Sequence, residues 1–330
     1  MKKKILITGG CGYIGSSLGN YFSDKYEVIT LDKRKKNIFL NKKIKHYICN
    51  LLDQNKLKKI LTKIKPDAVV HLAGQSTIDL VDKKKNEYYK NNILATNILV
   101  KIIKKLEIPK FIFSSTAAIY DKSKDTLKET SKIKSKNSYG LSKIKCEKIL
   151  IENFKLSKTN YCILRFFNVA SSLREKKIGE LHNPETHLIP ILINALYYKK
   201  DIQIYGNNYD TKDGTCLRDY IHISDILTGI EKSIIFLDKN KSNIFNLGSG
   251  RCYSVLDVIK NCEKMIKKNA IVLSKNLRRH DAAILMCDIS KSYKILKWKP
   301  IKSNLKKIIQ DEIWWFKYLK KKKIVRKYIY

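Results

Sequence analysis

The sequence of 330 residues predicts an α/β protein with a doubly wound parallel sheet, followed by a smaller C-terminal lobe. Short apolar runs alternate with helical patterns through the first half of the chain, as a parallel sheet requires. A glycine-punctuated turn joins the first apolar run to the first helical pattern. Beyond about residue 170 the pattern becomes mixed. We therefore predict one domain over residues 1–170 and a second over 171–330, with some segments returning to the first.

The expected strands of the first domain are short apolar or β-branched runs between turn signals. They cover residues 4–8, 27–31, 45–49, 68–72, 110–114 and 161–165. The run at 68–72 is nearly all apolar, which indicates burial on both faces of the sheet. Helical periodicity falls between these strands and continues into the second domain. The predicted helices cover residues 13–24, 54–63, 87–106, 138–156, 187–199, 224–237, 254–267 and 303–320.

The turn after the first strand has the glycine spacing of a dinucleotide-binding site. Gly9 allows the tight turn, Gly12 lets backbone approach a pyrophosphate, and Gly15 lets the helix pack closely on the sheet. The helix start offers N–H groups and a positive dipole end to phosphates. The second strand ends at Asp32, whose carboxylate suits ribose hydroxyls and repels a 2′-phosphate. These features predict NAD rather than NADP, with the basic run at 33–36 interpreted as solvated loop charge.

The formal net charge of +38 requires a polyanionic partner to be considered. The positive charge is nearly all lysine and is spread along the whole chain, with its densest cluster at 320–327. No motif of a nucleic-acid-binding module accompanies it. We therefore expect no specific nucleic-acid partner.

Eight cysteines are scattered through the chain without a C-x-x-C pair or a His/Cys cluster of metal-binding spacing. They are interpreted as buried thiols in a reducing compartment, and no metal site is expected. No signal peptide opens the sequence, and no apolar run reaches the roughly 18 residues that span a membrane. The expectation is a cytoplasmic protein without a membrane span.

Tyr139 and Lys143 are four residues apart on one predicted helix, so their side chains share a face. Ser114, Ser115 and Thr116 end the strand at 110–114 with three hydroxyl groups. Free tyrosine titrates near ~10, and a neighbouring ammonium and a positive nicotinamide ring should lower that pKa. Alone, such a pair is more often a surface contact, and such hydroxyls often only cap a turn. The glycine turn upstream favours a tyrosine base that acts beside a dinucleotide.

Further motifs make the chain resemble the UDP-glucose 4-epimerases and their relatives in the extended short-chain dehydrogenase/reductase family. The resemblance covers nearly the whole length, in order. Its segments are Thr8–Gly15, His71–Gly74, Tyr88–Asn92, Phe113–Thr116, Asn137–Lys143, Leu164–Asn168, Pro184–Pro190, Tyr209–His222 and Asn246–Gly250. The run from Asp213 to His222 is highly specific for sugar-nucleotide 4-epimerases.

The resemblance implies a Rossmann-type NAD-binding domain, a UDP-hexose substrate and a homodimer. NAD would be held by Gly9, Gly12, Tyr13, Ile14, Gly15, Asp32, Asn50, Leu51, Leu72, Ala73, Gly74, Asn91, Ser114, Tyr139, Lys143 and Phe167. The substrate would contact Thr116, Tyr139, Asn168, His187, Leu188, Arg218, Arg278, Asp281 and Leu285. Tyr139, Lys143 and Thr116 would be catalytic, with Tyr139 as the base. Asn50 stands where the family usually has Asp, and His280 where it usually has Gly.

The implied activity interconverts UDP-galactose and UDP-glucose through a 4-keto intermediate, using tightly bound NAD. Related dehydratases need an acid pair after the Thr116 position, where this chain has Ala117 and Ala118, so dehydration is rejected. Leu285 stands where relatives vary between a bulky tyrosine and smaller residues, so an N-acetylated sugar, alone or as a second substrate, remains an alternative. A non-catalytic protein that binds sugar nucleotides or polyanions is the alternative from another class, and the intact Tyr139, Lys143 and Thr116 argue against it.

Overall fold

The computed structural model describes residues 2–76, 85–121, 123–182, 184–239, 241–276 and 282–324. Its contacts divide the chain into two units. Unit 1 comprises Met1–Asp121, Lys132–Phe166 and Leu227–Phe245, and unit 2 comprises Lys122–Ser131, Phe167–Ile226 and Asn246–Tyr330. The chain thus changes unit after Phe166, near the predicted boundary at 170. The segment 122–131 also belongs to unit 2, which the sequence did not indicate.

Unit 1 is built on a seven-stranded sheet with the order β12-β6-β5-β4-β1-β2-β3. The neighbours from β3 to β6 pair in parallel, which confirms the predicted fold class. Successive strands run outwards in opposite directions from β1 and β4, and such a reversal places a ligand site at the carboxyl ends of these strands. The strands are β1 (Lys4–Thr8), β2 (Glu27–Asp32), β3 (Lys45–Ile48), β4 (Ala68–His71), β5 (Lys110–Thr116), β6 (Asn160–Phe166) and β12 (Asn243–Leu247).

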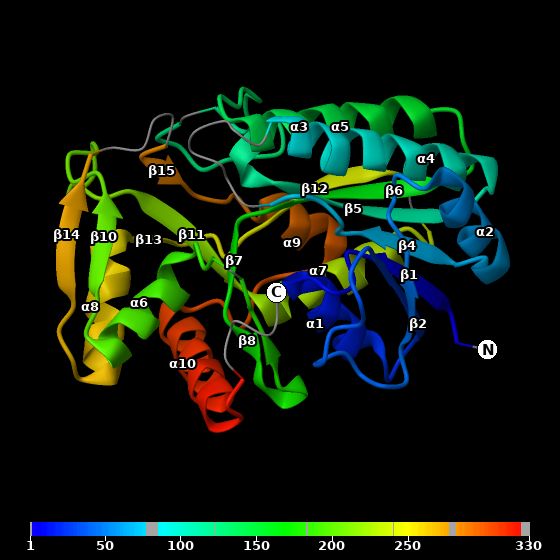
Figure 1. Ribbon diagram of the computed structural model, residues 1–330. Helices are drawn as coiled ribbons and strands as arrows, with labels where there is room; N and C mark the ends of the chain where they lie inside the picture. The colour runs from blue at the N-terminus through cyan, green and yellow to red at the C-terminus, as the bar shows by residue number, and fades with distance from the viewer. Residues whose placement is uncertain are drawn as a thin grey trace. The chain divides into compact units, whose positions relative to one another are not determined.

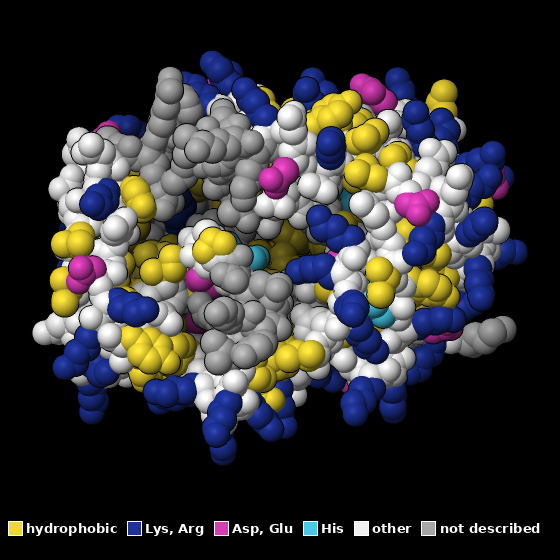
Figure 2. Space-filling view, viewed as in Figure 1, with side chains coloured by type: hydrophobic (Ala, Val, Ile, Leu, Met, Phe, Trp, Pro, Cys, Tyr) yellow, Lys and Arg dark blue, Asp and Glu magenta, His cyan; other side chains and the backbone are white. Residues whose placement is uncertain are grey.

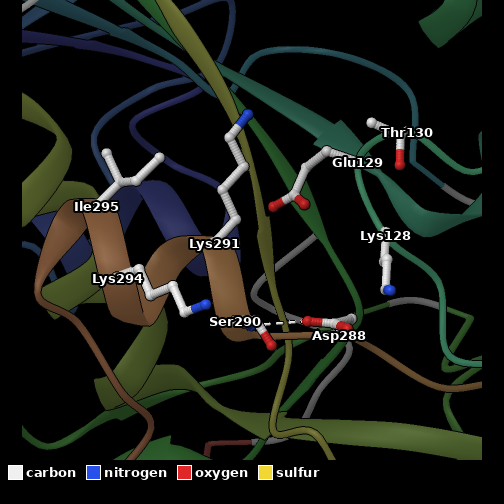
Figure 3. A pocket seen from close by; sticks show the side chains of 8 residues that line it. All are labelled: Lys128, Glu129, Thr130, Asp288, Ser290, Lys291, Lys294 and Ile295. Atoms are coloured by element: carbon white, nitrogen blue, oxygen red, sulfur yellow. Dashed lines mark hydrogen bonds between the residues drawn. The ribbon is translucent and has the colours of Figure 1, made fainter.

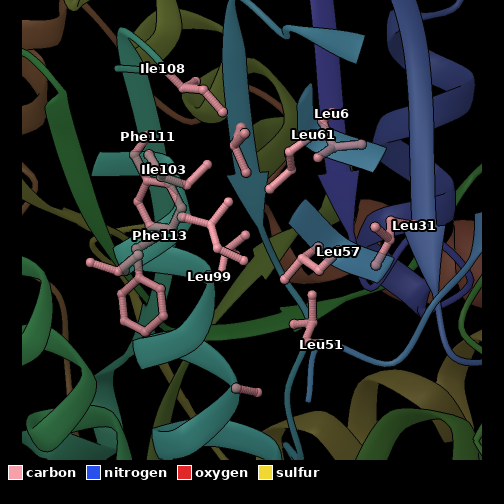
Figure 4. Close-up of a cluster of buried hydrophobic side chains, with 14 of the residues drawn as sticks. Leu6, Leu31, Leu51, Leu57, Leu61, Leu99, Ile103, Ile108, Phe111 and Phe113 are labelled. Carbon is pink, nitrogen blue, oxygen red and sulfur yellow. The ribbon is translucent and has the colours of Figure 1, made fainter. Parts of the chain in front are cut away.

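Helices cover both faces of this sheet, with α2, α4 and α5 above it and α1 and most of α7 below it in Figure 1. The helices are α1 (Tyr13–Phe22), α2 (Gln54–Ile64), α3 (Lys85–Tyr88), α4 (Ala95–Lys105), α5 (Ser138–Phe154) and α7 (Ile223–Phe236). A core of buried aliphatic and aromatic side chains fills the space under α2 and α4, including Leu6, Leu61, Leu99 and Phe111 (Figure 4). Burial on both faces explains the continuous apolar runs of the central strands.

The predicted helix at 87–106 is divided into three pieces. Between α3 and α4 the backbone forms a π-helical segment, η1 (Tyr89–Leu94). Elsewhere in unit 1, a short 3-10 segment, η2 (Ala117–Ile119), follows β5. The apolar periodicity of this region does not distinguish a π-helix from an α-helix. Such π-helical turns are rare and are often found at functional sites.

Unit 2 combines a small mixed sheet with a helical layer. β11 lies between β13 and β15 and also pairs with β7, while β10 pairs with β14 and β8 with β9. The strands are β7 (Asn168–Ala170), β8 (Ser172–Leu173), β9 (Ile178–Gly179), β10 (Asp201–Tyr205), β11 (Leu217–His222), β13 (Cys252–Ser254), β14 (Ile271–Lys275) and β15 (Ile284–Leu285). The helices are η3 (Arg174–Lys176), α6 (Leu188–Tyr198), α8 (Val255–Ile266), α9 (Ser290–Leu296) and α10 (Leu305–Lys321). Apolar faces of α6, α8 and α10 form its core.

All eight cysteines are free thiols, and only Cys252 among them is not buried. Lysine and arginine side chains are scattered over the visible face of the molecule (Figure 2). Among the described residues, none of the helices is long and apolar enough to cross a membrane.

Candidate active site

The turn between β1 and α1 requires glycine at two of the three predicted positions. Gly9 has φ +69°, and a Cβ on it would lie 2.7 Å from the backbone nitrogen of Ala73. A Cβ on Gly15 would lie 2.1 Å from the Gly9 carbonyl oxygen. Gly15 therefore lets α1 pack directly on the turn that precedes it. The turn also holds the segment after β4 close to the end of β1, because the Leu72 N–H donates to the Thr8 carbonyl (3.2 Å).

Gly12 differs from Gly9 and Gly15, because the space beside its Cα is open rather than filled by neighbouring atoms. It is the N-cap of α1 and provides no capping side chain. A Cβ on Gly12 would meet the Gly9 carbonyl at 3.2 Å and otherwise only the end of the flexible Arg34 side chain at 3.8 Å. Tyr13 and Ile14 follow as the first residues of α1. The start of this helix is therefore an accessible, positively polarised cradle of the kind that binds pyrophosphate.

Asp32 ends β2 beside this turn and is 7% exposed. Its carboxylate accepts the Cys11 N–H (3.0 Å), and the Arg34 guanidinium pairs with it through Nε (3.2 Å). The Arg34 side chain is 51% exposed, so it combines this ion pair with the solvent exposure predicted for the basic run at 33–36. Further along, Asn50 is exposed and caps its own turn by accepting the Leu52 N–H (3.1 Å), while Leu51 is buried.

These residues fit NAD on structural grounds. Gly12 leaves a backbone cradle that a Cβ would fill, and the carboxylate of Asp32 lies at the same turn, where it suits a ribose diol. Leu72, Ala73 and Gly74 follow β4 at the reversal point of the sheet order. Bound NAD would therefore be held by the start of α1, Asp32 and the segment after β4.

Replacement of Gly12 by alanine should separate cofactor binding from folding. The added methyl group requires a shift of only a few tenths of an ångström, so the unfolding temperature should stay close to that of the wild type. The same methyl group occupies the cradle, so NAD retained through purification should fall strongly. The matched variant Gly15→Ala should lose NAD and should also have a lower unfolding temperature, because its Cβ would overlap the Gly9 carbonyl. Loss of fold in both variants, or retained NAD in Gly12→Ala, would contradict this role for Gly12.

Tyr139 and Lys143 lie on α5, whose start is fixed by Asn137. The Asn137 side chain accepts the Gly140 N–H (2.7 Å) and caps the helix, as its residue type favours. Lys143 is 6% exposed, and its ammonium donates to the Ser114 carbonyl (2.7 Å) at the end of β5. Thr116 ends the same strand and hydrogen-bonds with the Tyr139 hydroxyl. The structure therefore brings the predicted Tyr139, Lys143, Thr116 and Ser114 together within unit 1.

The predicted lowering of the Tyr139 pKa applies to the site with its cofactor bound, and the protein alone acts in the opposite direction. Burial raises the pKa of the Tyr139 phenol to about 12, and the hydrogen bond with Thr116 opposes this rise. Burial also lowers the pKa of Lys143, which weakens its hold on a proton. In the protein alone, the pKa of Tyr139 therefore lies well above neutral pH. A bound nicotinamide cation acts in the opposite direction, because a nearby positive charge stabilises the phenolate.

Asn92, which follows the predicted NAD contact Asn91, is a further polar residue beside the predicted catalytic helix. Its buried side chain in η1 accepts the Gln75 N–H (2.7 Å) and donates to the Ser142 hydroxyl (2.9 Å). A Cβ on Gly74 would lie 2.9 Å from Asn92 Oδ1 and 3.9 Å from Lys143 Nζ. Asn92 therefore links the segment after β4 to the catalytic helix.

Unit 2 contains most of the predicted substrate contacts. Arg218 in β11 is 9% exposed and pairs in register with Leu285 of β15, so these two residues are neighbours. Asn168 begins β7 and pairs with Tyr220 of the same strand β11. Phe167 is buried, and its N–H donates to the Leu247 carbonyl (3.1 Å). The predicted contacts Arg278 and Asp281 lie outside the described residues.

His187 is the N-cap of α6, and Leu188 is the first residue of that helix. The His187 imidazole lies 3.1 Å from carboxylate oxygens of both Glu180 and Glu185. Burial alone would lower the pKa of His187, but the charges of Glu180 and Glu185 outweigh it and raise the pKa to about 9.

A cavity of about 460 Å³ in unit 2 lies at none of the predicted residues (Figure 3). Lys128 and Lys294 extend towards Asp288, whose carboxylate accepts the Ser290 N–H (2.8 Å). Burial alone would raise the pKa of Asp288, but hydrogen bonds from Ser290 and these two ammonium groups hold it below its usual value. Three lysines and two carboxylates, those of Glu129 and Asp288, line this cavity.

The fold and this constellation define an NAD-dependent enzyme of the Rossmann type. The chain belongs to the NAD dependent epimerase/dehydratase family, whose model matches residues 5–248. It is 34% identical over 318 residues to the UDP-glucose 4-epimerase of Halalkalibacterium halodurans, with 95% of each chain covered.

Solved structures show the same similarity. UDP-glucose 4-epimerase from Bifidobacterium longum in complex with NAD+ and UDP is 30% identical, with a TM-score of 0.88 over 96% of this chain and 98% of that one. The UDP-Glc/GlcNAc 4-epimerase of Campylobacter jejuni is 32% identical, with a TM-score of 0.82 over 96% and 99%. The family and these relatives confirm the predicted Rossmann-type fold, an enzyme of the epimerase class and NAD as the cofactor.

Proposed function

We propose that this protein is a UDP-glucose 4-epimerase, which interconverts UDP-galactose and UDP-glucose through a 4-keto intermediate. The observation that carries this proposal is the arrangement of Tyr139, Lys143 and Thr116 at the end of β5. It occurs in a chain that is similar over almost its whole length to UDP-glucose 4-epimerases. No carboxyl group follows Thr116, where buried Ala117 begins η2, so the site lacks the acid that elimination of water requires.

Tyr139 accepts the proton of the C4 hydroxyl group as the C4–H bond breaks, and the carbon becomes a ketone. The chemistry that bound NAD supplies is reversible acceptance of the hydride from C4. Thr116 hydrogen-bonds with the Tyr139 hydroxyl, which supports the proposal that it orients the same substrate oxygen. Lys143 stabilises the phenolate by its charge. The keto sugar then rotates in the site and presents the opposite face of C4. Tyr139 returns the proton to the C4 oxygen as the hydride adds to that face.

The sugar must turn while the nucleotide stays bound, so the UDP part requires firm contacts. Arg218 is proposed to bind the diphosphate, because a guanidinium can donate two hydrogen bonds to phosphate oxygens. Asn168, His187 and Leu188 are proposed as further UDP contacts, and the same role for Arg278 and Asp281 rests on the family resemblance alone. All of these side chains bind the substrate without taking part in the redox step.

We further propose a cytoplasmic homodimer that serves galactose metabolism. The eight free thiols support a reducing compartment. Helix α5 exposes Leu141 (44%) and Ile151 (39%), and apolar residues on a helix surface support association with a second copy. Light scattering after size exclusion should give twice the chain mass of 38.4 kDa. A single-chain mass at micromolar concentration would contradict the dimer.

The activity is tested by supplying UDP-galactose and UDP-N-acetylgalactosamine separately to purified protein and resolving the products by chromatography. Conversion of UDP-galactose to UDP-glucose without added cofactor supports the proposal. If protein shown to contain NAD converts neither sugar, the epimerase assignment is wrong. A non-catalytic nucleotide-binding protein then becomes the better interpretation, and a salt titration of DNA binding tests the polyanion alternative.

Activity on N-acetylated sugars is the second candidate, and Leu285 favours it. A leucine at this position occupies less volume than a tyrosine, and Leu285 lies directly beside Arg218. The similar C. jejuni protein is described as a UDP-Glc/GlcNAc 4-epimerase. The space left by Leu285 therefore supports a pocket that admits the larger N-acetyl group.

Replacing Leu285 with tyrosine should lower the ratio of UDP-N-acetylgalactosamine to UDP-galactose activity by about 10-fold or more, because the ring fills that space. The matched variant Leu285→Met conserves volume and should keep the ratio within a few-fold. The measurement is kcat/KM for each sugar. An unchanged ratio in Leu285→Tyr would show that this residue does not set the sugar preference.

A further inference from the structure

The segment between β9 and α6 gathers two histidines and two glutamates at one point. Glu180, His182, Glu185 and His187 each offer one ligand atom, and these four atoms lie within 4.8 Å of one another. His182 Nδ1 lies 2.8 Å from Glu180 Oε1, and His187 Nδ1 lies 3.1 Å from the same oxygen. The sequence spacing contains no familiar metal motif, so only the folded loop reveals this group.

The backbone of this segment is held firmly at both ends. The carbonyl of Glu180 accepts the Trp315 indole N–H (2.9 Å), and a Cβ on Gly179 would lie only 2.8 Å from the same ring. At the other end, the Glu185 carboxylate accepts the His187 N–H (3.0 Å), and His187 caps α6. The two ends of the segment, Glu180 and His187, therefore lie at α10 and at the start of α6.

The local charge favours a cation. Glu180 is 2% exposed, and among the described residues both of its ion-pair partners are imidazoles rather than ammonium or guanidinium groups. The negative charges of Glu180, Glu185 and Glu312 all act on His187. This concentration of carboxylates is unusual in a chain where Lys and Arg outnumber Asp and Glu by 68 to 30.

We propose that Glu180, His182, Glu185 and His187 form a binding site for one divalent transition-metal ion, with Zn²⁺ as the preferred ion. Two imidazole nitrogens and two carboxylate oxygens are suitable tetrahedral ligands for zinc, at about 2.0–2.2 Å from the ion. Neighbouring donors would then be about 3.4 Å apart, so small side-chain rotations within the observed cluster are sufficient. Four protein ligands leave no open position, and the role is structural.

Such an ion would clip the loop at 180–187 onto the start of α6. It would also bind His187 through Nδ1, which leaves Nε2–H as a single, defined hydrogen-bond donor. This inference stands independently of the proposed epimerase activity, because its readouts are metal binding and thermal stability.

The experiment uses full-length protein without a histidine tag, treated with EDTA, dialysed and titrated with Co²⁺ as a spectroscopic probe. We expect one Co²⁺ per chain with the intense visible bands of tetrahedral cobalt, displaced by Zn²⁺. We also expect Zn²⁺ to raise the unfolding temperature. His182→Ala and Glu185→Gln should each weaken Co²⁺ binding by at least about 100-fold.

Two controls and one internal check make the result decisive. His46→Ala and Glu175→Gln replace a histidine and a glutamate outside the cluster and should leave Co²⁺ binding unchanged. Retained NAD shows that each variant is folded. If His182→Ala does not fold, Glu185→Gln serves as the test variant. The proposal is overturned by the absence of tetrahedral bands, by thiolate-to-cobalt charge-transfer bands that indicate a cysteine site, or by unchanged binding in both cluster variants.

Discussion

Replacing Tyr139 with phenylalanine should lower kcat for UDP-galactose by about 10²- to 10⁴-fold, the usual contribution of a positioned acid–base group. The variant loses one hydroxyl group and keeps the ring that packs near Tyr88, with 6.1 Å between ring centroids. NAD content and unfolding temperature should therefore stay close to those of the wild type. The measurement is the initial rate at saturating substrate, with bound NAD quantified in the same preparation.

The pH dependence gives a second readout for the same residue. Only the phenolate can accept a proton, and burial raises the pKa of Tyr139 in the protein alone to about 12. The reactive fraction therefore grows as pH rises, so kcat/KM of the wild type should increase between about pH 6 and pH 8. The residual activity of Tyr139→Phe should lack this increase. Tyr89→Phe is the matched control, since Tyr89 is 55% exposed, and it should behave as wild type. Near-normal activity in Tyr139→Phe would remove Tyr139 as the base.

Replacing Glu147 with alanine should reduce the free energy of unfolding by about 3–5 kcal/mol, because it leaves a buried arginine without its counter-ion. Arg165 is 2% exposed and donates to Glu147 through Nε (3.1 Å) and a terminal nitrogen (2.8 Å). Glu147 also accepts the Ser115 hydroxyl, and Arg165 donates to the Tyr120 hydroxyl (2.9 Å). Urea unfolding followed by circular dichroism measures the loss.

This pair connects stability to the active site. Glu147 lies one helical turn after Lys143 on α5, and Ser115 lies between Ser114 and Thr116 on β5. The ion pair therefore fixes the helix and the strand that carry the catalytic side chains, and activity should fall together with stability.

Two matched variants test the cause of the destabilisation. The double variant Glu147→Leu with Arg165→Met removes both charges and should recover most of the lost stability, since no unpaired charge remains. Lys158→Ala breaks the exposed pair with Glu107, where the Lys158 side chain is 76% exposed, and should cost no more than about 1 kcal/mol. If Glu147→Ala and the double variant were equally unstable, lost packing rather than the unpaired charge would be the cause.

The sequence determined the elements of unit 1 because their signals are local. The strand Lys4–Thr8 matches its predicted bounds, and β2 to β6 differ from theirs by at most two residues at either end. Apolar runs, helical periodicity and the glycines at positions 9, 12 and 15 are properties of neighbouring residues, so a linear pattern records them. The same holds for Tyr139 and Lys143, which one turn of helix places on one face.

Other features depended on contacts between residues far apart in the chain. The buried side chain of Asn92 in η1 donates to the Ser142 hydroxyl on α5, a contact between residues 50 positions apart. The pairing of Glu147 with Arg165 requires β6 to lie under α5, and the register of β11 with β15 brings Leu285 beside Arg218. Burial, which raises the pKa of Tyr139, likewise exists only once the chain has packed.

The sequence by itself thus determined the class of fold and the cofactor, and it predicts Tyr139 and Lys143 as the catalytic pair. Only the tertiary structure decided which polar side chains support that pair, how acidic the tyrosine is, and that two histidines and two glutamates meet between β9 and α6. The physical reason is that local pattern specifies backbone conformation and facing, whereas electrostatics and ligand geometry depend on distances and desolvation that arise when distant segments pack together.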